Sequence, residues 1–319
     1  MNPSTPCDRL WRKRLHELSS VWPEFIGGHT TGLHKTRVAS RRIREALPIV
    51  GVCAPQAKVK KLSRKMRKLT RYLGPIRELD VKLDMLESAA RTAVIPERAL
   101  ELVRREVASQ RQALRDDLSD SVPVDDLRKL LRKLERIAET NDDRDKKHHR
   151  SDTRWRGALA TRLMRRAKEL GAALDEAGPI YVPERLHGVR IGVKKLRYAL
   201  EIAREAGVRR ASVLVRVLKR QQECLGRLHD SQALLRHVRE AEALPRVGSR
   251  VNDLTAYADS LERECRRLHA AFVERRSELM DCVKEVRQQI VPALATPPRR
   301  QARVASVRRP AVRARARAK

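Results

Sequence analysis

The chain has 319 residues, of which 41% are hydrophobic, 35% charged and 3% aromatic. This composition is typical of a folded protein with ample material for a core, and no apolar run is long enough to cross a membrane. The net charge of +32, from 72 basic and 40 acidic residues, is larger than solubility requires. It favours a polyanionic partner: nucleic acid, anionic lipid or a polymer of phosphate.

The N-terminal residues MNPSTPCDRLWRKRLHEL lack the apolar segment of a secretion signal. The five cysteines are odd in number and form no C-x-x-C pair, which is typical of reduced thiols and argues against a disulfide framework or a zinc site. We therefore expect a cytoplasmic protein. The cysteines are Cys7, Cys53, Cys224, Cys265 and Cys282.

A hydrophobic period of about 3.6 residues runs through nearly the whole chain and strand signals are almost absent, which predicts an all-α fold. Proline and glycine separate the predicted helices. The polar segment 140–152 is a predicted linker, and 297–319, with eight arginines, one lysine and no acid, a predicted disordered tail. The predicted helices are 8–22, 33–50, 56–72, 76–93, 97–118, 123–139, 153–177, 184–206, 209–225, 229–243 and 250–290.

Two pairs of segments match each other along the chain. LHKTRVASRRIREAL (33–47) matches LHGVRIGVKKLRYAL (186–200) at an offset of 153, and RKLTRYLGPIRELD (67–80) matches KRQQECLGRLHDSQ (219–232) at an offset of 152. Two matches in the same order indicate an internal duplication of a helical unit. The matched pairs are His34 with His187, Arg37 with Arg190, Arg41 with Lys194, Arg42 with Lys195, Arg44 with Arg197, Arg67 with Lys219, Lys68 with Arg220, and Glu78 with Asp230.

The basic residues of each first segment share one face of a helix. At about 100° per residue, those of 34–44 fall on a stripe less than a quarter-turn wide, opposite an apolar stripe. A solvated helix face usually mixes both signs of charge, yet 34–44 contains no acid. We interpret the stripe as an anion-binding surface. Its members are His34, Arg37, Arg41 and Arg44, with Arg42 at the edge, and in the second copy His187, Arg190, Lys194 and Arg197, with Lys195 at the edge; the apolar stripes are Ala39, Ile43, Leu47 and Val50, and Leu196, Leu200 and Ala203.

The next predicted helix of each copy is also basic. Like charges gathered in this way destabilise a fold unless an anion neutralises them, so the pattern predicts a groove for a polyanion. We expect two helical bundles, 1–145 and 146–292, related by a pseudo-two-fold axis around that groove, with a basic tail at 293–319. The additional basic residues are Lys60, Lys61, Arg64, Lys65, Arg67, Lys68 and Arg71, and Arg216, Lys219 and Arg220.

Metal binding and catalysis are less favoured. His34 and His187 lie among cations that would repel a metal ion, so a hydrogen bond to a phosphate oxygen, or a structural role in the core, fits them better. His148 and His149 are expected to be solvated in the linker. No Walker A, G-x-S-x-G or H-E-x-x-H motif is present. The nearby acids are interpreted as groups that orient arginines, in preference to metal ligands for phosphoryl transfer; they are Glu78, Asp80, Asp84, Glu87 and Asp230.

The doubled motif H-x-x-R-x-x-x-[RK]-[RK]-x-R, followed in each copy by LG-x-x-[RH]-[DE], resembles the CHAD domain, the conserved histidine α-helical domain, over residues 8–292. Glu78 stands where that family usually has Asp, and the tail lies outside its pattern. The resemblance implies two bundles around a basic pore that binds inorganic polyphosphate without catalysis; some members associate with polyphosphate or polyhydroxyalkanoate granules. The phosphate contacts that it implies are His34, Arg37, Arg41, Arg42, Arg44, Lys61, Arg64, Lys65, Arg67, Lys68, Arg71, His187, Arg190, Lys194, Lys195, Arg197, Arg216, Lys219 and Arg220.

Duplex DNA is the alternative ligand, chiefly because of the tail. Proteins that bind single strands stack bases on aromatic side chains, and of the two Phe, four Tyr and three Trp only Tyr72 and Tyr198 lie in the basic segments. A polymer with phosphates as its only handle needs nothing beyond these charges. We therefore favour inorganic polyphosphate as the partner and expect neither a cofactor nor a metal.

Overall fold

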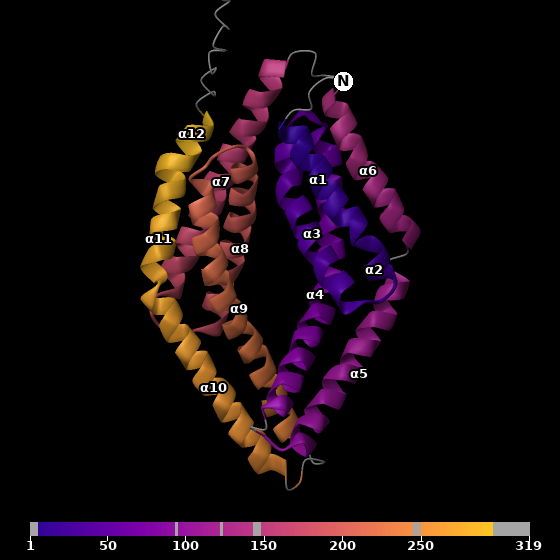
Figure 1. The fold of residues 1–319 in the computed structure, drawn as a ribbon, viewed down its shortest axis with the longest axis vertical. Helices are drawn as coiled ribbons and strands as arrows, with labels where there is room; N and C mark the ends of the chain where they lie inside the picture. Colours follow the sequence, from indigo (N-terminus) through magenta and orange to yellow (C-terminus); the bar gives the residue numbers. More distant parts are fainter. Residues whose placement is uncertain are drawn as a thin grey trace, which may run out of the picture.

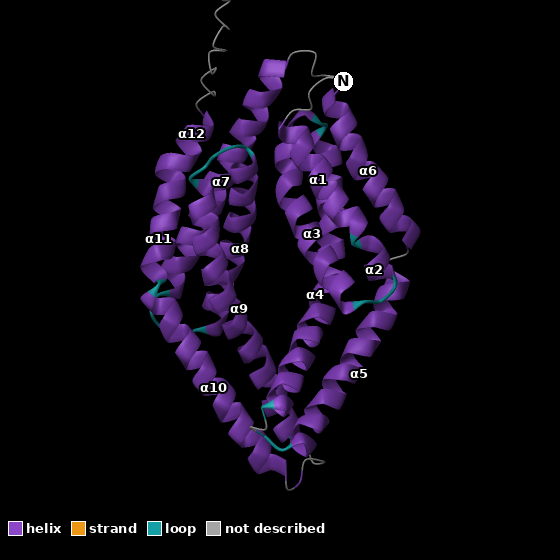
Figure 2. Cartoon of the chain, in the orientation of Figure 1, coloured by secondary structure: helices purple, strands orange, loops and turns teal. Residues whose placement is uncertain are grey.

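The computed structural model describes residues 6–92, 95–121, 124–142, 148–244, 248 and 250–295. These residues contain helices and no strand, so the predicted all-α fold is confirmed (Figure 2). The elements are α1 (Pro6–Ser20), α2 (Trp22–Ile26), α3 (Thr30–Val50), the 3-10 turn η1 (Gly51–Cys53), α4 (Gln56–Arg91), α5 (Glu97–Ser121), α6 (Val124–Asp142), α7 (His148–Ala177), α8 (Pro183–Glu205), α9 (Ala211–Glu242), α10 (Val251–Glu274), α11 (Arg276–Glu285), the π-helical turn η3 (Val286–Ile290) and α12 (Val291–Ala295).

The helices form two groups, α1–α6 and α7–α12, which lie on opposite sides of the molecule (Figure 1). Within the groups α3 packs against α1 and α4, and α8 packs against α7 and α9. Between the groups α3 contacts α7 and α8, and α4 contacts α9. The two helices that carry the basic stripes, α3 and α8, are therefore neighbours. The predicted division after residue 145 falls among residues outside the described part of the chain.

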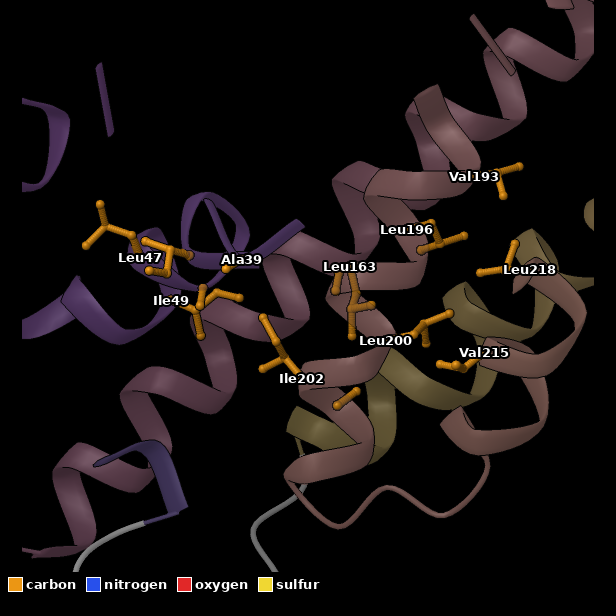
Figure 3. Close-up of a cluster of buried hydrophobic side chains, with 14 of the residues drawn as sticks. Ala39, Leu47, Ile49, Leu163, Val193, Leu196, Leu200, Ile202, Val215 and Leu218 are labelled. Carbon is orange, nitrogen blue, oxygen red and sulfur yellow. The ribbon is translucent and has the colours of Figure 1, made fainter. Parts of the chain in front are cut away.

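One hydrophobic core extends across both groups. Side chains from α3, α7, α8 and α9 belong to the same buried cluster, with Ala39 and Ile49 on one side and Leu163 and Leu200 on the other (Figure 3). Both predicted apolar stripes are buried, which confirms the core-facing sides of α3 and α8. Because burial of one leucine contributes about 1.5–3 kcal/mol, this shared core holds α3 and α8 in fixed positions.

Two predicted helix breaks are wrong. The predicted helices 56–72 and 76–93 are the single helix α4, which continues through Gly74 and Pro75, and 209–225 and 229–243 are the single helix α9. Proline removes one backbone hydrogen bond, but Ile76 and Leu79 beyond it are buried. Packing of these side chains offsets the local cost and keeps α4 continuous.

The helix boundaries differ from the prediction at two further places. The predicted helix 250–290 is divided at Arg275, and next to it Arg276 donates a hydrogen bond to the carbonyl of Leu174 on α7 over 3.0 Å. The predicted linker 140–152 is shorter than expected, because α6 reaches Asp142 and α7 begins at His148. The tail 297–319 lies outside the described residues.

The structure agrees with two simpler expectations. The five cysteines, all of which lie in the described part of the chain, form no disulfide bond. Among the described helices, none is long and apolar enough to span a bilayer.

A buried carboxylate ties the two groups of helices together. Glu45 on α3 accepts hydrogen bonds from Arg162 Nε over 2.6 Å and from Arg166 Nη2 over 2.7 Å, both on α7. Glu45 and Arg166 are buried, and the guanidinium groups hold the pKa of Glu45 below its usual range although burial acts to raise it. Removal of a single partner from such a buried network leaves uncompensated charge.

We predict that Glu45→Gln lowers the free energy of unfolding by about 3–5 kcal/mol, because the partly buried Arg162 would lose its carboxylate partner and the buried Arg166 would keep only Glu169, at 2.8 Å. Urea denaturation followed by circular dichroism measures the effect. Asp126→Asn is the matched control, since Asp126 pairs with Lys129 at 3.9 Å on the exposed surface of α6 and is expected to change stability little. Equal stability of the two variants would contradict this role of Glu45.

Candidate anion-binding site

Basic side chains from four helices converge where α3 and α8 face each other. We call them the basic cluster. The charges that act on one another show this proximity: the pKa of His34 on α3 is lowered by burial and then by Arg77 on α4, by Arg37 and Arg41, and by Lys194 on α8. The basic cluster comprises His34, Arg37 and Arg41 of α3, Arg77 of α4, His187, Arg190 and Lys194 of α8, and His229 of α9.

Two arginines at equivalent positions of the repeat oppose each other in this cluster. Burial lowers the pKa of Arg37 to about 10, with a further contribution from the charges of Arg41 and Arg190, while Glu78 acts in the opposite direction. The Nε atoms of Arg37 and Arg190 are both buried without a hydrogen-bond partner. A buried donor without a partner costs about 1–3 kcal/mol. An anion that accepts from both guanidinium groups would remove that cost.

Lys194 is the most strongly perturbed cation of the cluster. Burial, followed by the charges of Arg190, Arg41 and Arg37, lowers its pKa to about 6, although Asp230 opposes the effect. Within the described part of the chain, neither Arg37, Arg41 nor Lys194 forms an ion pair with a carboxylate. The protein thus holds these groups in positions where each disfavours the charge of the others.

The histidines of the cluster have lowered pKa values, and two of them contact each other. Nδ1 of His187 lies 3.3 Å from Nδ1 of His229, so one ring donates this hydrogen bond and the other accepts it. Burial and the neighbouring cations, Arg190 first among them, lower the pKa of His229 to about 3, and the pKa values of His34 and His187 are lowered in the same direction. Neutral imidazole can still donate to a phosphate oxygen at neutral pH. Among the described residues, no three His, Cys, Asp or Glu side chains converge as metal ligands.

Acidic side chains hold individual arginines in place at the edges of the site. Asp230 on α9 lies 3.7 Å from Arg190, and burial raises the pKa of this carboxyl. Asp84 lies 3.7 Å from Arg77, and the buried Asp80 accepts a hydrogen bond from Arg111 over 2.6 Å. These contacts agree with the interpretation that the acids orient arginines.

Comparisons with known proteins decide the family. The family model of the CHAD domain matches residues 9–239. The chain belongs to the CHAD domain family. The crystal structure of the CHAD domain from the plant Ricinus communis shares its fold, with a TM-score of 0.53 and 22% identity; the match covers 89% of this chain and 91% of that one. PptA from Streptomyces chartreusis also shares the fold, with a TM-score of 0.53 and 17% identity, over 89% of this chain and 97% of that one. No curated protein matches the chain.

Three further predicted contacts of this CHAD domain, Arg42, Lys195 and Arg197, also pair with acids, two of them with acids from other helices and Arg197 with an acid of its own helix. Arg42 lies 3.3 Å from Glu17 on α1 and 3.4 Å from Glu201 on α8. Lys195 lies 3.4 Å from Glu169, and Arg197 pairs with Glu201 and stacks over the ring of Tyr198 at 4.5 Å. The one-signed stripe of the sequence is therefore divided in space, because part of it packs against acids that are distant in the chain.

The remaining predicted contacts lie on the surface of the CHAD domain. Arg44 connects them with the basic cluster, because burial and then the charges of Arg67 and Arg41 lower its pKa. Arg220 pairs with Glu278, and the ammonium of Lys68 lies 5.6 Å from the ring centroid of Tyr72. The exposed residues are Lys61, Arg64, Lys65, Arg67, Lys68 and Arg71 on α4, and Arg216, Lys219 and Arg220 on α9.

Two members of the basic cluster were missing from the predicted contacts. Arg77 and His229 occupy equivalent positions in the second pair of matching segments, at the offset of 152. The repeat in the sequence therefore already indicated that these two positions could belong to the site. The indication was weak because arginine and histidine differ in type and neither belongs to a run of basic residues.

The buried Lys194 predicts a pH dependence of folding. Its folded pKa of about 6 lies below its ordinary value of 10.5, so folding releases its proton between these two values. The free energy of unfolding should therefore rise with pH in that window, by up to about 1.4 kcal/mol per unit from this group. Denaturation between pH 6 and 9 should show a smaller slope for Lys194→Met than for the unchanged protein.

Lys168→Met on α7 is the control for this measurement, since Lys168 is exposed and its replacement should leave the slope unchanged. Identical slopes for Lys194→Met and the unchanged protein would show that Lys194 keeps its proton on folding, which contradicts the proposed burial of this cation.

Proposed function

We propose that this CHAD domain binds inorganic polyphosphate at the basic cluster and does so without catalysis. The proposal rests on the half-buried cations Arg37, Arg41 and Lys194, which face one another without carboxylate partners among the described residues. Like charges in this arrangement raise the free energy of the empty site, and a multiply charged anion lowers it. Guanidinium groups in addition offer paired donors that match phosphate oxygens.

A polymer fits this site better than a single phosphate ion. The basic cluster continues through Arg41 and Arg44 to Arg67 and from there along the exposed basic residues of α4. A chain of phosphates can contact both the buried cations and this exposed row. We therefore propose that the exposed basic residues of α4 and α9 extend the binding surface, whereas Arg42, Lys195 and Arg197 chiefly hold helices together.

The chemistry of the basic cluster favours a phosphate polymer over duplex DNA. The side chain of Arg190 is only 14% exposed, so a narrow chain reaches it more readily than a double helix does. Duplex DNA remains the alternative, with the arginine-rich tail as the part that would contact it. We further propose that polyphosphate binding directs a cytoplasmic protein to polyphosphate or polyhydroxyalkanoate granules.

The double variant Arg41→Gln, Lys194→Gln should bind long-chain polyphosphate at least about tenfold more weakly, because hydrogen bonds to charged groups contribute about 1.5–3 kcal/mol each. Fluorescence anisotropy with end-labelled polyphosphate measures the affinity. Without ligand, the variant should be at least as stable to heat as the unchanged protein, since a repulsive contact has been removed.

Lys133→Gln, Lys168→Gln is the matched control, because it removes the same charge from exposed positions on α6 and α7. This control should change the affinity less than about twofold. The slope of log affinity against log salt concentration should fall, by an amount that corresponds to about two phosphate contacts, only for the variant at Arg41 and Lys194. Equal affinities of the two double variants would place the binding surface away from the basic cluster.

A further inference from the structure

A cavity of about 620 Å³ adjoins the basic cluster. It lies between the start of α8, the middle of α9 and α10, and two members of the cluster, His187 and His229, form part of its wall. The cavity and the cluster are therefore continuous. Its volume falls in the range of sites for small organic ligands, which is roughly 300–1,000 Å³.

Part of the wall of the cavity is apolar. Tyr181, Pro183 and Leu235 line it. The ring of Tyr181 is fixed from two sides: it meets the ring of His269 edge-on, with centroids 5.0 Å apart, and its hydroxyl accepts a hydrogen bond from Nε2 of Gln232 over 2.8 Å. An inorganic phosphate chain has no apolar part, so polyphosphate alone leaves this wall without a role.

Polar groups at the edge of the cavity supply hydrogen bonds of both kinds. Glu262 and Gln232 line it and carry acceptor oxygens, and Gln232 also carries an amide donor. Arg236 and Arg266 line it as well, and the charge of Arg236 is one of those that lower the pKa of His229. A ligand with a flat aromatic part, hydrogen-bonding edges and a chain of phosphates matches these three surfaces together.

We propose that this cavity binds the base of a nucleoside polyphosphate whose phosphates lie on the basic cluster. The base stacks against Tyr181, and the phosphates extend past His187 and His229 toward Arg190. The inference rests on the proposed function for the phosphate half of the site alone. A single tyrosine provides a place for one base, which suits a mononucleotide and does not provide the series of aromatic platforms that a nucleic acid strand needs.

A second cavity of the structure lacks this combination. It has a volume of about 320 Å³ and is lined by Phe25 of α2, His29 just before α3 and Leu33 of α3, with Gln112 and Arg115 of α5. None of the described residues that line it belongs to the basic cluster. The connection between an apolar wall and buried cations thus distinguishes the cavity at α8.

Calorimetric titration of the full-length protein with ATP and with inorganic tripolyphosphate, both free of magnesium, tests the proposal. The two probes carry the same number of phosphates, and stacking of one base contributes about 1–3 kcal/mol. ATP should therefore bind at least about fivefold more tightly. Tyr181→Ala should remove this advantage while it leaves the affinity for tripolyphosphate and for long-chain polyphosphate unchanged.

Ile180→Ala is the matched control, since Ile180 precedes Tyr181, is 66% exposed and does not line the cavity. Arg190→Gln should weaken both probes. Equal affinities of ATP and tripolyphosphate, absence of ATP binding, or an ATP preference that survives Tyr181→Ala would each overturn the proposal. Failure of the proposed function gives a different result, in which long-chain polyphosphate does not bind and ATP still shows a preference that depends on Tyr181.

Discussion

Arg37 and Arg41 on α3 face Arg190 and Lys194 on α8, where burial and the neighbouring cations lower the pKa values of Arg37, Arg190 and Lys194. The effect is largest at Lys194, where burial and the neighbouring cations lower the pKa to about 6. A chain under selection for stability alone would place acids among these groups or replace them with apolar residues of similar volume. An anion bound between the helices, as we propose, would offset the free energy that the repulsion among these cations costs.

The remainder of the structure resists the separation of α3 and α8. Their apolar faces share one core, and acids tie the neighbouring helices across the same boundary: Glu45 joins α3 to α7, and Glu205 at the end of α8 accepts hydrogen bonds from Lys13 and Arg14 of α1 over 3.0 Å each. These networks neutralise their basic residues with acids, whereas Arg37, Arg41 and Lys194 of the basic cluster have no carboxylate partner among the described residues. The distribution of carboxylates thus separates the part of the interface that stabilises the fold from the part that is available to a ligand.

Much of this arrangement could be predicted from the sequence, because helix periodicity and the two matching segments are local properties. The buried faces of α3 and α8 and the basic faces opposite them follow from spacing alone. The ends of the helices were harder to predict. The burial of Ile76 keeps α4 continuous across Pro75, and that burial depends on contacts with other helices. The site shows the same limit. Arg42 lies three residues from Glu45 in the sequence, yet its carboxylate partners are Glu17 and Glu201, which reach it from α1 and α8.

We propose that the half-buried cations between α3 and α8 select a narrow phosphate chain. Competition tests it most directly: labelled long-chain polyphosphate is bound at physiological salt to protein without residues 297–319, and duplex DNA is added at equal phosphate concentration. We expect polyphosphate to stay bound, because a double helix cannot reach side chains such as that of Arg190, of which 14% is exposed. Displacement of polyphosphate by DNA would contradict it, since an accessible basic surface would then explain binding without the buried cations.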